Sequence, residues 1–307
     1  MRIGFGAPVS GAWATPDSLG RFAAQAEVAG YASLWTFQRL LVPEGAAMEP
    51  VYHSVLDPMV ALGYAAAVTS RIRLGVAVVN MPYLAPGYLA KQAASVDVLS
   101  GGRLDLGLGL GWMPQEFELA GGVMTARGAR TAEYLEVMRR LWAGGVAEFA
   151  GEHYTIPAGR AAPVPVQRPG PPVLLGGTVP QALRRIGRLA DGWITSSRAD
   201  LSRIAEGIEV IKTAAAGAGR DPDRLRVICR GVVRWGAPVT VSEGGGRVLL
   251  SGGFDDIRAD TAWLAGQGVT EVFYDLNWDP LVGAPAVDPA GAAARAEEIL
   301  EGLAPGR

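Results

Sequence analysis

Residues 103–117, RLDLGLGLGWMPQEF, bring together residue types that could hold a flat ligand. Leucines alternate with other residues as in a short strand, and the glycines allow another group to approach the backbone closely. An aromatic ring and a carboxylate follow. The segment is either the ligand-binding end of a strand or a glycine-rich strand end with a buried tryptophan. The residues concerned are Gly107, Gly109, Gly111, Trp112 and Glu116.

A second glycine-rich turn follows another apolar strand. Gly176, Gly177 and Thr178 come after the segment PVLL and before a helix expected to begin near Pro180. Backbone N–H groups at such a turn, together with the helix dipole, can bind a phosphate. The same residues would equally suit a tight strand-to-helix turn.

Two charged positions stand out near expected strand ends. Arg230 interrupts an apolar strand, and a buried arginine needs an anionic partner. That partner is either a cofactor phosphate or a structural Asp or Glu. Gln38 and Arg39 end another strand, where they either face a pocket or belong to a solvated loop.

Composition excludes several other kinds of site. The formal net charge of −2 gives no electrostatic basis for binding nucleic acid or an anionic membrane. Cys229 is the single cysteine, and the two histidines are His53 and His153, so we expect no disulfide and no metal centre. No Ser-His-Asp, Cys-His or paired-carboxylate motif is evident. We expect a cytoplasmic protein that acts on a small molecule.

The elements that must position these residues follow a regular order. Eight apolar segments each precede a helical segment, which predicts an α/β fold, a single (β/α)8 TIM barrel spanning residues 1–307. Insertions are expected in about 113–165, with a β-hairpin over 146–156. The alternative is two doubly wound halves that meet near the proline-rich residues 161–172. The strands are expected at 2–7, 31–37, 71–80, 103–109, 172–176, 192–196, 224–233 and 269–276.

In such a barrel the site lies at the carboxyl ends of the strands. The residues expected there include few carboxylates or histidines and many aromatic, glycine, Ser/Thr and Arg residues. We interpret this rim as a binding site for a large planar anionic cofactor that performs the chemistry.

Three segments resemble a known family: 56–70 (LDPMVALGYAAAVTS), 71–112 (ending LSGGRLDLGLGLGW) and 164–193 (VPVQRPGPPVLLGGTVPQALRRIGRLADGW). The chain resembles the luciferase-like oxidoreductases, and most closely the branch that uses the deazaflavin coenzyme F420. The resemblance implies a barrel with a flavin-type cofactor at its carboxyl-end mouth. It also implies a nonprolyl cis peptide around Ala77 to Val79, in a bulge behind the cofactor ring.

The resemblance further implies which residues contact the cofactor. The segment Gly107–Trp112 and the turn Gly176–Thr178 would line the ring and its phosphate. The other expected contacts are Ser10, Ala77, Val78, Val79, Met81, Ser196, Arg198 and Arg230.

One departure concerns the catalytic groups. Many relatives end the second strand with Asp-His or Glu-His, where this chain has Gln38 and Arg39. A histidine base is therefore absent at this point. Arg39 could bind an anionic substrate or the polyglutamate tail of F420, and Gln38 also approaches the cofactor. Glu116 or Tyr83 could supply a proton.

The expected activity is hydride transfer between coenzyme F420 and a small organic substrate. The first alternative is a monooxygenase that uses reduced FMN and O2, and the second is a flavin-binding protein without catalysis. The small-residue helix 59–69 would permit close packing, and relatives often dimerise near strands two and three, so we expect a homodimer.

Overall fold

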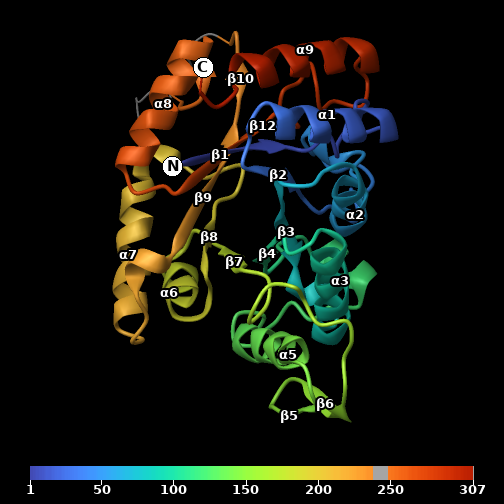
Figure 1. Cartoon of the computed structure of the whole chain (residues 1–307), viewed down its shortest axis with the longest axis vertical. Helices are drawn as coiled ribbons and strands as arrows, with labels where there is room; N and C mark the ends of the chain where they lie inside the picture. The colour runs from blue at the N-terminus through green and yellow to red at the C-terminus, as the bar shows by residue number, and fades with distance from the viewer. Residues whose placement is uncertain (238–247, 307) are drawn as a thin grey trace.

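The computed structural model describes residues 1–237 and 248–306. Its centre is a closed barrel of eight parallel strands in the spatial order β1-β12-β9-β8-β7-β4-β3-β2 (Figure 1). Because the sheet closes on itself, the expected TIM barrel is confirmed and the alternative of two doubly wound halves is wrong. The strands are β1 (Arg2–Gly6), β2 (Ser33–Thr36), β3 (Arg73–Asn80), β4 (Leu104–Gly109), β7 (Val173–Gly176), β8 (Gly192–Ile194), β9 (Arg226–Val232) and β12 (Glu271–Asp275).

Among the described residues, eight long helices surround the barrel. Their starts follow the capping residues in the sequence: Thr15 and Asp57 accept hydrogen bonds from the first turns of α1 and α2, and proline takes the first helical position of both. The helices are α1 (Pro16–Val28), α2 (Pro58–Val68), α3 (Pro86–Leu99), α5 (Thr131–Ala143), α6 (Pro180–Leu189), α7 (Ile204–Ala216), α8 (Phe254–Gly266) and α9 (Pro289–Gly302).

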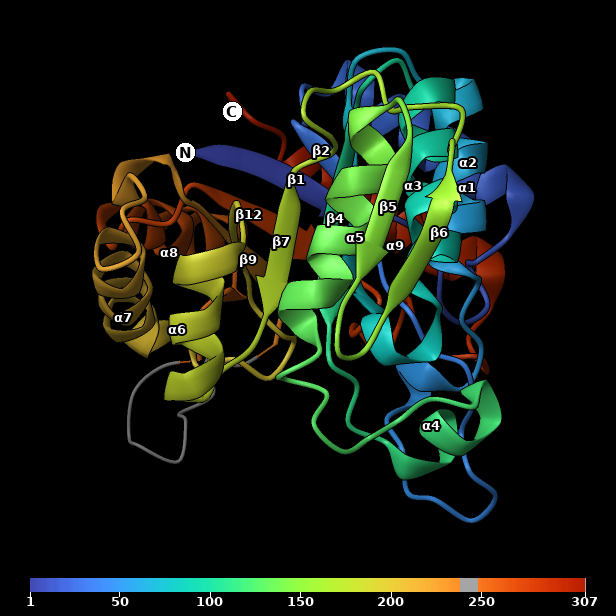
Figure 2. The ribbon, with the colours of Figure 1, turned by 90° about the horizontal axis from the view of Figure 1, so that it is seen from below.

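The smaller elements lie in the connections. The expected hairpin is present as the antiparallel pair β5 (Ala147–Ala150) and β6 (Thr155–Gly159). Sequence analysis missed the short helix α4 (Pro114–Ala120) and the strand pair β10 (Arg234–Trp235) and β11 (Ser251–Gly252). Figure 2 shows α4 on the side to which β7 points. None of the described helices combines the length and apolar character that crossing a membrane requires.

Successive side chains of a strand point alternately toward the helices and into the barrel, so the apolar core has two parts. In β4, Leu104, Leu106 and Leu108 are fully buried in the cluster between barrel and helices. The intervening residues of β4, Asp105, Gly107 and Gly109, therefore face the barrel interior. A separate apolar cluster fills the interior with one or two residues from each of six strands.

The interior is layered from one end of the barrel to the other. At the amino end, Asp105 and Glu271 are fully buried and pair with arginines, including Arg226. In the middle, Trp35 stacks on Phe273 with ring centroids 5.2 Å apart. At the carboxyl end a second buried ion pair joins β9 and β12. The apolar layer between these two polar layers separates the base of the barrel from its mouth.

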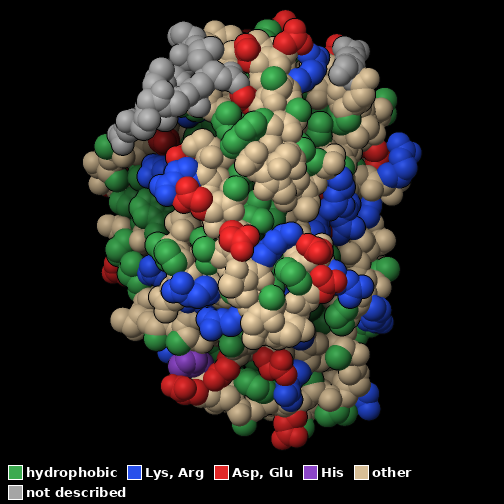
Figure 3. All heavy atoms as spheres, turned by 90° about the vertical axis from the view of Figure 1, so that its left-hand side faces the viewer, with side chains coloured by type: hydrophobic (Ala, Val, Ile, Leu, Met, Phe, Trp, Pro, Cys, Tyr) green, Lys and Arg blue, Asp and Glu red, His purple; other side chains and the backbone are tan. Residues whose placement is uncertain are grey.

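The pKa of Asp105 shows how strongly the basal layer is held. Burial opposes ionisation of this carboxyl group. Hydrogen bonds from Arg73 and Arg226 outweigh that effect, so the pKa lies below its ordinary value. On the outer surface, acidic and basic side chains are interspersed over the face shown in Figure 3.

Candidate functional site

A bulge in β3 forms one wall of the barrel mouth. The Ala77–Val78 peptide bond is cis, and the register of β3 against β4 shifts between Val76 and Val79. This is the feature that the family resemblance implied. Ala77 and the Val78 side chain belong to the interior cluster, whereas Val79 is buried in the layer between barrel and helices.

The interior glycines of β4 make room for this bulge. A Cβ added at Gly107 would clash with the carbonyl oxygen of Val76, and one added at Gly109 would lie 2.6 Å from Val78 Cγ2. These glycines therefore have a structural reason that sequence analysis did not identify. Their contact with a cofactor stays a prediction.

Arg230 is the buried cation at this end of the barrel, with 7% of its surface exposed. Its Nε donates a 2.6 Å hydrogen bond to Asp275, and its Nη1 donates a 3.1 Å bond to the carbonyl of Ala77. The ring centroid of Trp278 lies 4.0 Å from the guanidinium. A structural carboxylate, one of the two partners left open by the sequence, is present as Asp275, and Arg230 ties β9 and β12 to the bulge.

Glu116 contacts two other residues that were expected to act in catalysis, Arg39 and Tyr83. The carboxylate is 2% exposed and lies 3.1 Å from Arg39 Nη1. It accepts a 3.1 Å hydrogen bond from the Tyr83 hydroxyl and a 2.8 Å bond from the backbone N–H of Leu40. The Glu116 carboxylate thus holds Arg39, Tyr83 and the Leu40 backbone together at the mouth.

Tyr83 and Arg39 differ in what they can offer a ligand. Burial raises the pKa of Tyr83, and the charge of Glu116 raises it further, so the hydroxyl keeps its proton at neutral pH. The Arg39 guanidinium lies 4.3 Å from the ring centroid of Tyr52 and 5.3 Å from that of Trp112. Its Nε is buried, and no described residue accepts a hydrogen bond from it.

Gln38 lies at the same rim but has a different role in the structure. Its side-chain oxygen accepts a 2.9 Å hydrogen bond from the backbone of Asn80. The Asn80 side-chain oxygen in turn accepts a 2.9 Å bond from the backbone of Gly111. This chain of bonds links the ends of β2, β3 and β4, so Gln38 positions the rim.

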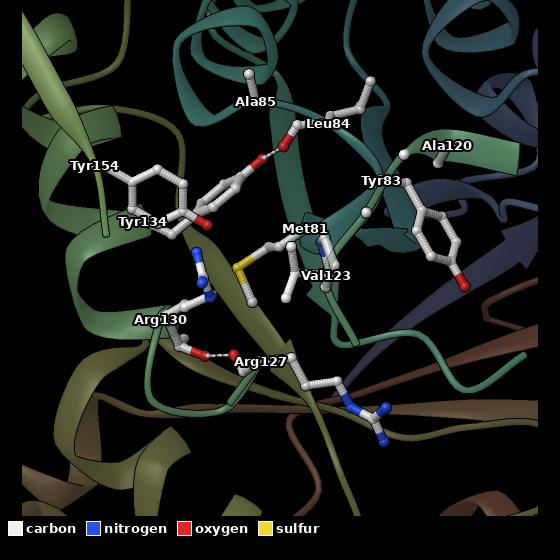
Figure 4. A pocket seen from close by; sticks show the side chains of 14 residues that line it. Met81, Tyr83, Leu84, Ala85, Ala120, Val123, Arg127, Arg130, Tyr134 and Tyr154 are labelled. Atoms are coloured by element: carbon white, nitrogen blue, oxygen red, sulfur yellow. Dashed lines mark hydrogen bonds between the residues drawn. The ribbon is translucent and has the colours of Figure 1, made fainter. Parts of the chain in front are cut away.

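An arginine-lined pocket of about 260 Å³ opens beside the mouth (Figure 4). The 3-10 helix η2 (Met81–Tyr83) forms one wall of the pocket. Arg127, Arg130 and Tyr134 form the other. In Figure 4 the Arg130 guanidinium points toward the tyrosine rings, while Tyr83 points away from the pocket. No described carboxylate pairs with Arg127 or Arg130, and the Nε of Arg130 is buried without a described partner.

A small adjoining pocket connects these arginines with the predicted phosphate turn. Met81 and Thr131 line both pockets, and Gly176 and Arg185 line the second. Burial lowers the pKa of Arg185, and the neighbouring Arg188 adds to the effect. A Cβ added at Gly176 would lie 3.7 Å from its nearest neighbouring atoms, which is ordinary van der Waals contact. The pocket pair thus combines a glycine backbone with three arginines.

The other expected contacts lie elsewhere around the mouth. Ser10 is fully buried, and its hydroxyl donates to the carbonyl of Val51. Gly177 accepts a hydrogen bond from the Trp193 ring, and Thr178 is exposed. Trp112 is 54% exposed. Ser196 is exposed, and Arg198 lies 3.6 Å from Glu49.

Sequence analysis missed the arginines that line the pockets. Arg127 and Arg130 lie just before α5, and no motif in the sequence there indicates a binding site. It also assigned no role to Asp275, although a signal was available. Arg226 and Arg230 are four residues apart, as are Glu271 and Asp275 on the neighbouring strand. This matched spacing predicts two ion pairs between the two strands.

Two relatives of known sequence share part of the chain. An uncharacterised protein of Mycobacterium tuberculosis is 43% identical over 171 residues, which are 55% of this chain and 60% of that protein. The oxygenase component of the flavin-dependent trigonelline monooxygenase of Acinetobacter baylyi is 33% identical over 128 residues, 41% of this chain and 35% of the relative. The matched segments therefore cover less than two thirds of the length of either relative.

Solved structures share the fold over nearly the whole chain. The monooxygenase RslO1 of Streptomyces bottropensis superposes with a TM-score of 0.77 at 22% identity and covers 99% of both chains. The coenzyme F420-dependent tetrahydromethanopterin reductase of Methanopyrus kandleri gives 0.75 at 18% identity, covering 99% of this chain and 98% of that one. Residues 3–239 match the family described as luciferase-like monooxygenase. Since this match includes most of the sequence, the chain belongs to the luciferase-like monooxygenase family.

Proposed function

We propose that the protein is an oxidoreductase that exchanges a hydride between coenzyme F420 and a small organic substrate at the carboxyl-end mouth of the barrel. The observation that carries the choice of coenzyme is the group of three arginines, Arg127, Arg130 and Arg185, without a described carboxylate partner. A phosphate followed by a polyglutamate tail supplies several negative charges for such a group.

The residues present fit an anionic cofactor. The buried Nε of Arg130 lacks a described acceptor, and an anionic oxygen at the pocket would supply one. Arg127, Arg130 and Arg185 would hold the charged groups, and Gly176 lines the small pocket together with Arg185. The bulge at Ala77–Val78 would lie behind the ring. When bound, the deazaflavin supplies the hydride chemistry.

The chain itself orients the substrate and controls protons. Tyr83 holds its proton at Oη and donates a hydrogen bond to Glu116. Arg39 offers its unpartnered Nε to an anionic or carbonyl oxygen of the substrate. We assign the role of hydrogen-bond donor to Tyr83 and the role of positioning residue to Glu116.

A flavin-dependent monooxygenase is the second candidate function. The observation in its favour is the 33% identity with the oxygenase component of the trigonelline monooxygenase, which is flavin-dependent. In this case FMN would occupy the same mouth, and its single phosphate would contact only part of the arginine group.

We further infer that the protein forms a homodimer through α2 and α3. Both helices carry large apolar side chains that are exposed in the single chain, including Val60 at 72%, Tyr88 at 60% and Leu99 at 71%. A patch of this kind favours association with a second copy.

Turnover assays test the proposed activity. Reduced F420 is supplied anaerobically with a panel of enones and imines, and its oxidation is followed; reduced FMN with O2 is tested in parallel. F420 oxidation that depends on both enzyme and acceptor supports the proposal, and it should fall strongly in Tyr83→Phe. Turnover with FMN and O2 alone overturns it in favour of a monooxygenase. Tight F420 binding with no turnover on any acceptor would indicate a binding protein.

A further inference from the structure

A separate cavity of about 310 Å³ lies at the opposite end of the barrel from the mouth. Val173 and Arg226, which line it, are the first residues of β7 and β9. Parallel strands place their first residues at one end of the barrel and their last residues at the other. This cavity is therefore distinct from the candidate site around Glu116 and Arg130.

Arginines from three parts of the chain converge on this cavity. Arg139 comes from α5, Arg168 from the connection before β7, and Arg224 and Arg226 from the beginning of β9. Of the residues that line it, Asp191 carries the one carboxylate. Four cations around a single anion are an unfavourable arrangement unless another anion compensates for them.

The carboxylate of Asp191 does not provide that compensation. It accepts a 2.8 Å hydrogen bond from the backbone of Val173 and lies 3.8 Å from Arg220, a further arginine. Arg139 and Arg168 instead donate to the carbonyls of Leu189 and Pro165. Carbonyl oxygens satisfy the hydrogen bonds but leave the positive charges in place.

Arg224 and Arg226 add to the positive charge. No described carboxylate lies within ion-pair distance of Arg224. Arg226 binds Asp105 and Glu271, but these two carboxylates also serve Arg73 and Arg2, so three guanidinium groups share two anions. The Nε of Arg226 is buried and has no described hydrogen-bond partner.

We propose that this basal cavity binds a small organic polyanion that carries phosphate or carboxylate groups. Guanidinium groups bind both kinds of oxyanion through paired hydrogen bonds. The volume lies at the lower end of the range of about 300–1,000 Å³ for small-molecule pockets, which suits a compact metabolite. Arg226 connects the cavity to the buried basal layer, so occupation of the cavity stabilises the barrel.

Calorimetric titration with inorganic pyrophosphate and, separately, with citrate tests the proposal on the intact protein at constant ionic strength. The informative variant is Arg168→Ala/Arg224→Ala, since both side chains are exposed and neither has a described ion-pair partner. The matched control is Arg160→Ala/Arg203→Ala, which removes two exposed arginines outside the cavity. The variant Arg130→Ala tests whether a probe binds instead at the pocket beside the mouth, which Arg130 lines.

We expect saturable binding of at least one probe, together with a rise in melting temperature. The dissociation constant should be at least about tenfold weaker in Arg168→Ala/Arg224→Ala, because each charge-assisted hydrogen bond contributes strongly. The control and Arg130→Ala should bind as the wild type does. Binding of pyrophosphate alone identifies a phosphate site, and binding of citrate alone identifies a carboxylate site. Absence of binding, equal loss in the control, or loss only in Arg130→Ala would overturn the proposal.

Discussion

At the scale of single residues, the Arg39–Glu116 pair determines the charge available at the mouth. The side chains are 6% and 2% exposed, so each ion depends on the other for its compensation. Glu116 also accepts hydrogen bonds from the Tyr83 hydroxyl and the Leu40 N–H. This arrangement holds the Tyr83 hydroxyl in place as a hydrogen-bond donor at the mouth.

A double-mutant cycle tests this interdependence. Glu116→Ala leaves Arg39 buried without its partner and should lower the free energy of unfolding by about 3–5 kcal/mol. Arg39→Ala should lower the free energy of unfolding by a similar amount. The double variant should lose clearly less than the sum of the two single losses. Urea unfolding of the four proteins measures these values. Additive costs, within about 0.5 kcal/mol, would contradict a coupled pair.

The sequence identified Arg39, Glu116 and Tyr83 as candidates but could not show that they contact one another. Arg39 follows β2, Tyr83 follows β3 and Glu116 lies in α4, so only the closed barrel brings them together. Arg230 shows the opposite case, because its chemistry suited either a phosphate or a carboxylate. Only the packing of β9 against β12 identifies Asp275 as its partner.

At the scale of elements, the bulge of β3 and the glycines of β4 depend on one another. The sequence showed the glycines and suggested a ligand beside them. The structure places strand β3 in that space at Gly107 and Gly109. A sequence pattern cannot distinguish a close approach by a ligand from one by a neighbouring strand, since both require the missing side chain.

Alanine substitutions at Gly107 and Gly176 test whether a glycine is required by the packing of a neighbouring strand. Gly107→Ala should destabilise the fold by about 2–4 kcal/mol, because the added methyl group would meet the backbone of Val76. Gly176→Ala is the matched control, since its nearest neighbour would lie at ordinary contact distance, and it should cost less than about 1 kcal/mol. Thermal unfolding provides the comparison. Equal effects would argue against the packing explanation for Gly107.

Hydrogen bonds between Glu27 of α1 and the residues just before β3 predict a pH dependence of stability. Burial disfavours the charged form of Glu27 and so raises its pKa. Backbone hydrogen bonds from Ser70, Arg71 and Ile72 outweigh this effect and lower the pKa to about 2 from the ordinary 4.5. A lowered folded-state pKa stabilises above pH 4.5, and this contribution is lost as the pH falls toward 2.

Glu27→Gln should therefore reduce the free energy of unfolding at pH 7 by about 1 kcal/mol, since water screens this exposed site. The difference from wild type should narrow in urea unfolding as the pH falls from 4.5 toward 2. Glu118→Gln, at another exposed position, serves as the control. A difference that stays constant over this pH range would contradict the assigned role.

At the scale of the whole molecule, most of the barrel could be predicted from the sequence. Apolar segments alternate with well-capped helices, and both signals are local. Helix α4 was missed because seven residues give too short a periodic pattern. The arginine-lined pocket could not be predicted, because Arg127, Arg130 and Arg185 come together only when α5 and α6 pack beside the mouth.

The proposed dimer can be tested on the exposed helix faces. Val60→Glu/Leu99→Glu introduces two charges into the α2–α3 patch and should convert the protein to a monomer in sedimentation velocity experiments. Val28→Glu, at an exposed apolar residue of α1, should leave the assembly unchanged. A wild-type protein that sediments as a monomer would refute the dimer.

The most direct test of the central claim is calorimetric titration of the protein with coenzyme F420 and, separately, with FMN. The account predicts micromolar or tighter binding of F420, with FMN at least about tenfold weaker, since more negative charges reach the arginine group. Arg127→Ala/Arg130→Ala should lose most of the F420 affinity. Tighter binding of FMN, or binding of neither compound, would contradict the proposed coenzyme.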